Sequence, residues 1–385
     1  MENRYRIFKT EYVASGLRIK GVIFCNYQGG IKLSDQIKID SHKLMLHPKC
    51  VSNWLDGDRI YPIEMEIGLS SACNHRCIFC AVDYMEYKPQ MLKPEVILPN
   101  LKMMAKKGLK SIIYAGEGEP LVNKDAGLII NKTKEYGIDA AMSSNGVLLS
   151  KDFSENCLQS LSWIRFSIAG ATDTTYEKIH VARKGDLQLV LKNLQDAVEV
   201  KRKKQLHTTL GAQLLLLPEN KDEVVMLAKM MREIGLDYFT VKPFSQHPKS
   251  KTKLHVDYSE SQEIGRAVKE YETEKFKVYF RERAMENLVH EKSYDKCNGL
   301  SFMAYMDAKG NVFPCIVFMG EDKYRYGNIN ERSFEELWES EQADKLRNIF
   351  QGEFIKKNCR KTCRLDEINK YLYELQHPSN HVNFI

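Results

Sequence analysis

Three cysteines lie close together in the first quarter of the chain. Cys73, Cys77 and Cys80 follow the spacing C-x3-C-x2-C in the segment CNHRCIFC. Ten cysteines in 385 residues would produce this spacing by chance about 0.007 times, so an accidental pattern is a poor explanation. Thiolates gathered in this way are ligands for zinc or for an iron–sulfur cluster, and the spacing therefore indicates a metal site.

The number of thiolates bears on what such a site does. A structural zinc site needs four ligands, usually from two short pairs, whereas three cysteines on one turn surround a metal from one side only. Ferredoxin-type runs use a different spacing and a further cysteine. Three thiolates on a four-iron cluster leave one iron open, as an open position does in catalytic zinc sites. The spacing favours such an open cluster, with zinc or a plain electron-transfer cluster as the alternatives.

The cysteine loop resembles the signature of a known family. With Phe79 at the aromatic position, C-x3-C-x-(aromatic)-C is similar to the loop of the radical S-adenosylmethionine enzymes. In that family the open iron binds S-adenosylmethionine, and an electron from the cluster produces a 5′-deoxyadenosyl radical that removes a substrate hydrogen atom. The resemblance implies a [4Fe–4S] cluster on Cys73, Cys77 and Cys80, with S-adenosylmethionine as cofactor. It also implies a flavodoxin- or ferredoxin-type reductant.

Further cofactor contacts follow from the same resemblance. Gly118, Glu119 and Pro120 stand one strand–helix unit after the cysteine loop and resemble the GGEP motif, which holds the amino group of S-adenosylmethionine. Glu117 stands where that motif usually has its first glycine, and an ordinary turn of this composition is the alternative. The remaining expected contacts come from the later strands: Asn145, Ser167 and Gln213. The fourth strand ends Ser-Ile-Ala-Gly where the family often has Ser-Leu-Asp-Gly, so no role is carried over for that aspartate.

A second group of four cysteines lies near the C-terminus. Cys297, Cys315, Cys359 and Cys363 surround a predicted hairpin and a C-x3-C pair. Judged by ligand chemistry alone, four thiolates suit zinc and a fully ligated [4Fe–4S] cluster equally well. The arrangement resembles the C-terminal extension of the SPASM/twitch subgroup, in which full SPASM domains have seven cysteines and two clusters. Four cysteines therefore imply one auxiliary cluster.

The elements between these motifs alternate between strands and helices. Apolar runs predict six strands, at Ile63–Leu69, Leu109–Ala115, Ile138–Ser143, Trp163–Ala169, Thr208–Leu217 and Tyr238–Pro243. Amphipathic helices between them imply parallel pairing. Six units are too few for a closed eight-stranded barrel. We therefore expect an α/β fold, a partial (β/α)6 TIM-like barrel with a small C-terminal α+β domain, and with the chemistry at the carboxyl ends of the strands.

The pattern divides the chain into five parts. They are an N-terminal extension of strands plus a short helix near Pro48–Leu55 (1–60), the barrel core (61–250), a helical connector (251–294), the auxiliary-cluster domain (295–365) and a surface tail (366–385).

Composition excludes several other classes of protein. The net charge is only +6, and no stacking aromatics interleave the basic runs, which argues against nucleic acid as a partner. No apolar run is long enough to span a membrane. The opening MENRYRIFKTEYV lacks the apolar segment of a signal peptide, so the ten cysteines predict a reducing, cytoplasmic setting.

The functional prediction is a radical S-adenosylmethionine oxidoreductase. A fully ligated second cluster suits one-electron transfer and hence a two-electron oxidation. A small sugar- or nucleotide-like substrate is favoured, because Lys242, Ser245, Gln246 and His247 follow the sixth strand and offer polar groups to an anion, although a solvated loop explains them nearly as well. The alternatives are a peptide-modifying maturase, a radical epimerase and, more distantly, a non-catalytic iron–sulfur or zinc protein. The sequence assigns no catalytic acid, base or hydrogen donor.

Overall fold

The computed structural model describes residues 9–14, 17–22, 41–259 and 261–384. The chain forms two compact units, residues 1–38 and residues 39–385. In the first unit, β1 (Lys9–Ala14) and β2 (Leu17–Val22) pair antiparallel as a hairpin. The rest of the predicted extension up to residue 40 lies outside the described residues. The helix α1 (Pro48–Leu55) lies where a short helix was expected and belongs to the second unit.

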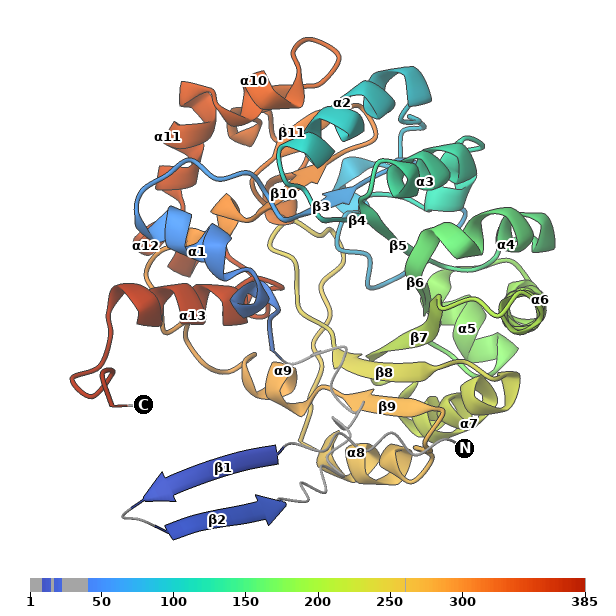
Figure 1. Cartoon of the computed structure of the whole chain (residues 1–385). Coiled ribbons are helices and arrows are strands. Elements are labelled where there is room, and N and C mark those ends of the chain that lie inside the picture. The colour runs from blue at the N-terminus through green and yellow to red at the C-terminus, as the bar shows by residue number, and fades with distance from the viewer. Residues whose placement is uncertain (1–8, 15–16, 23–40, 260, 385) are drawn as a thin grey trace. The chain divides into compact units, whose positions relative to one another are not determined.

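The described part of the second unit is organised around one large sheet (Figure 1). Six of its strands are parallel neighbours in chain order: β3 (Glu64–Ile67), β4 (Ser111–Tyr114), β5 (Asp139–Ser144), β6 (Leu161–Ser167), β7 (Thr209–Leu216) and β8 (Tyr238–Pro243). The strand order begins at β12 and ends at β9, so the sheet is not closed. This arrangement confirms the predicted partial barrel.

Helices cover the outer face of the curved row of strands, as Figure 1 shows. They are α2 (Pro94–Lys106), α3 (Ala126–Glu135), α4 (Lys151–Cys157), α5 (Asp173–His180), α6 (Asp186–Lys203) and α7 (Val224–Ile234). Alternate strand residues, such as Phe166 on β6 and Val241 on β8, are buried in the core that these helices share with the sheet. Because side chains alternate along a strand, Arg165 and Lys242 point to the opposite, inner face.

The segment between the barrel and the C-terminal domain differs from the expected helical connector. Residues 251–294 contain α8 (Ser261–Lys269), the strand β9 (Lys277–Phe280) and α9 (Glu282–Glu286). β9 pairs parallel with β8 and so adds a seventh parallel strand to the barrel. This segment forms a strand because every second side chain is apolar and buried. Phe276, Val278 and Phe280 are buried, and their neighbours are exposed or partly exposed.

The C-terminal domain continues the same sheet at its other edge. β10 (Met303–Met306) pairs parallel with β3 and antiparallel with β11 (Asn311–Phe313), and β12 (Gly327–Asn328) follows β11. The hairpin turn is held by Asp307, whose Oδ1 accepts hydrogen bonds from the backbone N–H groups of Lys309 (3.0 Å) and Asn311 (2.8 Å). The hairpin that leads to Cys315 is therefore paired directly with the first barrel strand.

Four helices complete the C-terminal region: α10 (Phe334–Trp338), α11 (Glu341–Ile349), α12 (Glu353–Asn358) and α13 (Asp366–Gln376). The expected surface tail is mostly α13. Leu372 of this helix is fully buried against Val51 and Phe302, because Leu365, Ile368 and Leu372 recur at helical spacing. Within the described residues, no helix is both long and apolar enough to cross a membrane.

Candidate active site and auxiliary cluster site

The cysteine loop follows β3 and is attached to the end of α5. The backbone N–H of Arg76 donates to the carbonyl of His180 (3.0 Å), and that of Ile78 donates to Ile179 (2.9 Å). A turn within the loop is closed by the N–H of Cys80 and the carbonyl of Cys77 (3.0 Å). These bonds hold the loop at the carboxyl end of the barrel strands, which is the predicted position.

The three thiols of the loop are partly buried and lie close enough to affect one another's pKa. Burial raises the pKa of Cys73 to about 11 and raises those of Cys77 and Cys80, and negative charge on Cys80 adds to the shift at the other two. The Tyr87 hydroxyl offsets part of the shift at Cys80 by hydrogen bonding. Thiols crowded in this way lose their protons with difficulty. A bound cationic metal group stabilises them as thiolates. The loop therefore fits an iron–sulfur cluster.

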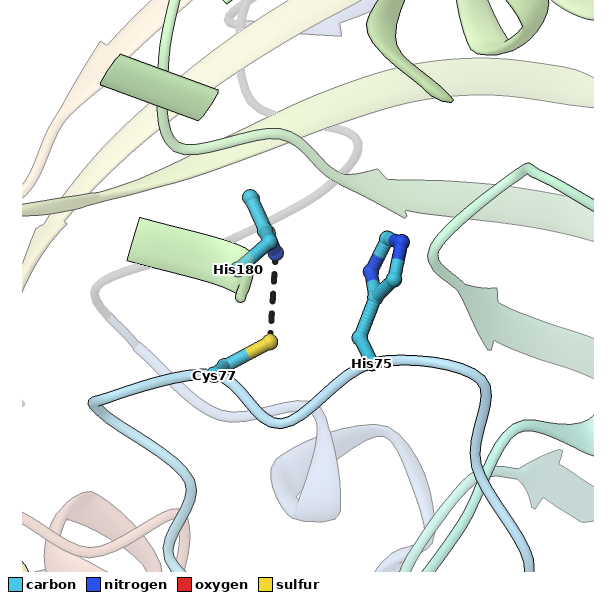
Figure 2. A group of neighbouring side chains, drawn as sticks. All are labelled: His75, Cys77 and His180. Atoms are coloured by element: carbon cyan, nitrogen blue, oxygen red, sulfur yellow. Dashed lines mark hydrogen bonds between the residues drawn. The ribbon is translucent and has the colours of Figure 1, made fainter. Parts of the chain in front are cut away.

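Two histidines complete the surroundings of Cys77 (Figure 2). The His180 Nδ1 lies 3.2 Å from the Cys77 Sγ, and the His75 Nε2 lies 3.1 Å from Asp186 Oδ2. The ligand atoms of His75, Cys77 and His180 all lie within 4.8 Å of one another. Burial lowers the pKa of His180 to about 3, so its ring is neutral. Sequence reasoning did not single out His180, which lies on a different element from the cysteine loop.

The glycine-rich turn after β4 packs against the cysteine loop. The Glu119 N–H donates to the Ala72 carbonyl (2.9 Å), and a side chain at Gly118 would overlap the carbonyl oxygens of Ser70 and Ala72. Only glycine fits there, which explains one residue of the predicted motif. Pro120 is buried and begins a short 3-10 helix.

The Glu119 carboxylate joins this turn to the end of β5. It accepts hydrogen bonds from Ser144 Oγ (2.7 Å), the Asn145 N–H (2.8 Å) and the Leu121 N–H (3.2 Å). Asn145 in turn donates to the Asn74 side chain inside the cysteine loop (2.7 Å). The structure therefore brings Glu119 and Asn145 together with the cysteine loop.

The other expected cofactor residues lie further along the barrel. Ser167 and Gln213 are register partners on β6 and β7 and belong to the inward-facing series. Phe79 packs edge-on against His180, with 5.5 Å between ring centroids, and against a cluster that includes Phe244. Contact of any of these residues with S-adenosylmethionine stays a prediction.

Glu117, the departure from the glycine-rich motif, connects the cofactor turn to the C-terminal hairpin. Its Oε1 accepts a hydrogen bond from the Ala308 N–H (2.7 Å) in the turn between β10 and β11. Burial, with a contribution from the negative charge of Asp307, raises the pKa of Glu117 to about 7. The side chain therefore couples the two halves of the molecule through a carboxyl group that is easily protonated.

Replacing Glu117 by Gln is expected to flatten the pH dependence of stability. Because the folded-state pKa is raised from 4.5 to about 7, the stabilisation from protonated Glu117 is full below pH 4.5 and is lost as pH rises through 7. Over this pH range the free energy of unfolding of the wild type should fall by up to about 3 kcal/mol. That of E117Q should stay constant, because its amide does not titrate and the amide oxygen still accepts the hydrogen bond from Ala308. Denaturant titrations at several pH values measure this. E233Q, at an exposed glutamate on α7, serves as control, and parallel curves for E117Q and wild type would contradict the raised pKa.

The four C-terminal cysteines line one apolar pocket. Cys297 precedes a short 3-10 helix, Cys315 follows β11, Cys359 follows α12 and Cys363 precedes α13. The walls are formed by aromatic and aliphatic side chains that include Tyr294, Tyr305, Phe318, Phe350 and Phe354. The Asn369 amide donates to Cys297 Sγ (3.3 Å), and the Leu365 N–H donates to Cys363 Sγ (3.4 Å). These donors are typical of a site that holds thiolates.

The four thiols are poor acids in this pocket. Burial raises the pKa of each of them, that of Cys363 to about 12, and the charges of neighbouring cysteines add to the shift at Cys297, Cys315 and Cys363. A bound metal group would stabilise them as thiolates. Four such thiolates fit an all-cysteine zinc site and a fully ligated [4Fe–4S] cluster alike.

Comparison with known proteins agrees with this geometry. The Radical SAM superfamily model matches residues 67–231, and the SPASM model, an iron–sulfur cluster-binding domain, matches residues 297–364. GTP 3′,8-cyclase of Aquifex aeolicus is 30% identical over 178 residues, which are 45% of this chain and 53% of that protein. The match thus spans about half of that relative's length. GTP 3′,8-cyclase of Campylobacter jejuni is 24% identical over 267 residues, or 66% of this chain and 80% of that protein.

Solved structures share the fold. Streptococcus suis SuiB bound to S-adenosylmethionine superposes with a TM-score of 0.58 at 18% identity, over 77% of this chain and 70% of SuiB. SuiB bound to its precursor peptide SuiA superposes with a TM-score of 0.60 at 18% identity, over 87% of this chain and 78% of SuiB. The anSMEcpe structure with bound AdoMet superposes with a TM-score of 0.52 at 18% identity, over 80% of this chain and 89% of anSMEcpe.

The chain therefore contains a Radical SAM domain followed by a SPASM iron–sulfur cluster-binding domain. These two domains imply S-adenosylmethionine and [4Fe–4S] clusters, including an auxiliary cluster, as cofactors. The match to an iron–sulfur domain decides the question of zinc against a cluster that the sequence alone left open.

Proposed function

We propose that the protein is a radical S-adenosylmethionine oxidoreductase that oxidises a small anionic, sugar- or nucleotide-like molecule. When bound, the clusters and S-adenosylmethionine supply one-electron cleavage of the cofactor and removal of a hydrogen atom from the substrate. The chain's own side chains must bind and orient that substrate. The observation that carries the proposal is an excess of positive charge on the inner face of the barrel.

Lys242 is the centre of this excess. It belongs to the inward-facing series of β8, which also contains Tyr238 and Thr240. Burial lowers its pKa, and so do the positive charges of four arginines, Arg165, Arg360, Arg281 and Arg364. Among the described residues, Lys242 has no acidic partner. A partly buried ammonium group without a counter-charge is destabilised, and such a group is a candidate for binding an anion.

Some of the surrounding cations already have partners. Arg364 pairs with Glu64 (3.2 Å) and Glu66 (2.8 Å) on β3. Arg360 donates to the Ser245 carbonyl (2.7 Å). Burial lowers its pKa, and the negative charges of Cys363, Cys315 and Cys359 offset part of this shift. The Nε atoms of Arg165 and Arg360 are both buried without a hydrogen-bond partner in the described structure. Together with Lys242, these two guanidinium groups can therefore bind an anion.

The loop after β8 contributes part of what the sequence suggested. Ser245 Oγ and His247 Nε2 are buried without hydrogen-bond partners in the described structure, as expected for groups that await a ligand. Gln246 instead uses its amide within the loop, donating to the carbonyls of His247 (3.0 Å) and Thr252 (3.1 Å). We therefore retain Lys242, Ser245 and His247 as substrate candidates and not Gln246.

The relatives support the substrate class. Several carry the name GTP 3′,8-cyclase, and that name refers to a nucleotide. Peptide modification is the second candidate, because SuiB, which shares the fold, was solved with a precursor peptide. The unpaired cations of the inner face favour the small anion, since they provide charges for a compact anionic group.

The test is substrate-dependent cleavage of S-adenosylmethionine. Reduced protein is incubated with low-molecular-mass and peptide fractions of a cell extract, and 5′-deoxyadenosine is quantified. We expect the low-molecular-mass fraction to stimulate cleavage and to yield a product lighter by two hydrogens. Deuterium from one substrate carbon should appear in 5′-deoxyadenosine. Stimulation by peptides alone would favour the maturase, and a product of unchanged mass carrying one solvent deuterium would favour an epimerase.

A matched pair of lysine variants tests the anion site in the same assay. K242M should raise the KM for the stimulating substrate by about tenfold or more, since a charge-assisted hydrogen bond is lost. K229M, at an exposed lysine on α7 whose nearest carboxylate lies 3.9 Å away, should behave as wild type. Equal KM values for the two variants would contradict the assignment of Lys242.

A further inference from the structure

His180 is a buried histidine in direct contact with an expected cluster ligand. It is the last residue of α5, and its side chain is wholly inaccessible to solvent. Its Nδ1 lies 3.2 Å from the Cys77 Sγ, the contact that Figure 2 marks with a dashed line. No motif of the cysteine loop predicts a histidine there.

The second ring nitrogen determines the direction of this contact. The backbone N–H of Ala169 donates to the His180 Nε2 at 2.9 Å. A nitrogen that accepts a hydrogen bond carries no proton, so the proton of the neutral ring is on Nδ1. The bond therefore runs from Nδ1–H to the Cys77 sulfur.

The fold holds both partners of this hydrogen bond. The loop backbone bonds to Ile179 and to His180 itself, through the N–H groups of Ile78 and Arg76. The His180 ring packs between Tyr176, at 4.3 Å between centroids, and Phe79, at 5.5 Å. Because α5 and the cysteine loop are joined on both sides of the contact, the donor has little freedom to leave the sulfur.

The same contacts argue against a separate metal ion on His75, Cys77 and His180, although their ligand atoms are close. If the His180 Nδ1 bound a metal, its proton would move to Nε2. Two N–H donors, Nε2–H and the Ala169 N–H, would then face each other at 2.9 Å. The observed geometry suits a hydrogen-bond donor at Nδ1, not a ligand.

We propose that His180 is a positioning residue that donates a hydrogen bond to the Cys77 ligand sulfur and thereby raises the reduction potential of the three-cysteine cluster. One-electron reduction adds negative charge that is partly carried by the sulfurs, and a donor stabilises the reduced form more than the oxidised form. The inference rests on Cys77 as a cluster ligand and does not depend on which substrate is used. Its failure would therefore leave the proposed substrate class untouched.

Two substitutions separate the hydrogen bonds of the ring. The amide nitrogen of Asn approximates the position of Nδ1, and the amide of Gln approximates that of Nε2. H180N thus keeps a donor for Cys77 and loses the acceptor for Ala169, whereas H180Q keeps the acceptor and loses the donor. Both variants leave the three cysteines in place.

The experiment is an EPR-monitored reductive titration of the reconstituted full-length protein. At a fixed potential, we expect the ratio of reduced to oxidised three-cysteine cluster to fall about tenfold in H180Q, the usual effect of losing a hydrogen bond to a charged acceptor. H180N should stay near wild type, and the auxiliary cluster should not change in either variant. Equal shifts in both variants, no shift in H180Q, or a stoichiometric zinc lost from both variants would each overturn the proposal.

A measurement on the wild type keeps the proposal testable if H180Q does not fold. With 15N-histidine and deuterated solvent, pulsed EPR of the reduced cluster should show a coupled histidine nitrogen, in addition to exchangeable deuterons from His180 and from the Tyr87 hydroxyl at Cys80. Absence of the histidine nitrogen coupling would refute the hydrogen bond.

Discussion

Simultaneous replacement of Cys73, Cys77 and Cys80 by Ala is expected to abolish reductive cleavage of S-adenosylmethionine while the chain still folds. The three thiols converge at the carboxyl ends of the strands, where the cofactor turn packs against them. They lie outside the large apolar core shared by the strands and outer helices, so their loss should not unfold the barrel. The measurement is 5′-deoxyadenosine formed under dithionite, together with circular dichroism of the variant.

A cysteine control makes this result specific. Cys50, on α1, belongs to neither cysteine group, and C50A should keep wild-type cleavage. Detectable 5′-deoxyadenosine from the folded triple variant would show that the cluster is held elsewhere. His75 and His180 would then be the first residues to examine, because their ligand atoms lie beside Cys77.

The parts of the fold that the sequence predicted well have local signals. The apolar run Thr208–Leu217 became β7 (Thr209–Leu216), and Tyr238–Pro243 became β8 with the same bounds. In a parallel sheet covered by helices, strands read as nearly continuous apolar runs, so composition alone marks them. The cysteine loop could be predicted equally well, because cluster ligands on one loop have a characteristic spacing.

The parts that the sequence did not predict depend on contacts between distant residues. The expected helical connector contains β9, whose alternation covers only Lys277–Phe280 and whose place in the sheet depends on parallel pairing with β8, about forty positions earlier. The parallel pairing of β10 with β3 joins residues more than two hundred positions apart, and hairpin patterns do not specify it. The contacts of Glu117 with Ala308 and of His180 with Cys77 likewise have no local signature.

Replacement of both Cys315 and Cys359 by Ala is expected to remove about half of the iron from the reconstituted protein. Two four-iron clusters give about eight irons and eight sulfides per chain, and loss of two ligands of four should leave about four of each. Cys315 and Cys359 enter the pocket from the end of β11 and the end of α12. After their loss only Cys297 and Cys363 remain, and two thiolates are too few to hold a four-iron cluster. Iron and sulfide analysis after anaerobic reconstitution measures this.

The remaining four irons should keep the EPR change that S-adenosylmethionine induces, because the three-cysteine loop is a separate segment on β3. Less of the cleaved cofactor should lead to oxidised product, since the auxiliary site is the proposed acceptor of the substrate electron. C157A removes a buried cysteine of α4 that lies in neither group and should retain about eight irons. A wild type that saturates near four irons with one bound zinc would instead make the C-terminal site structural, and the oxidative function would then lack its electron acceptor.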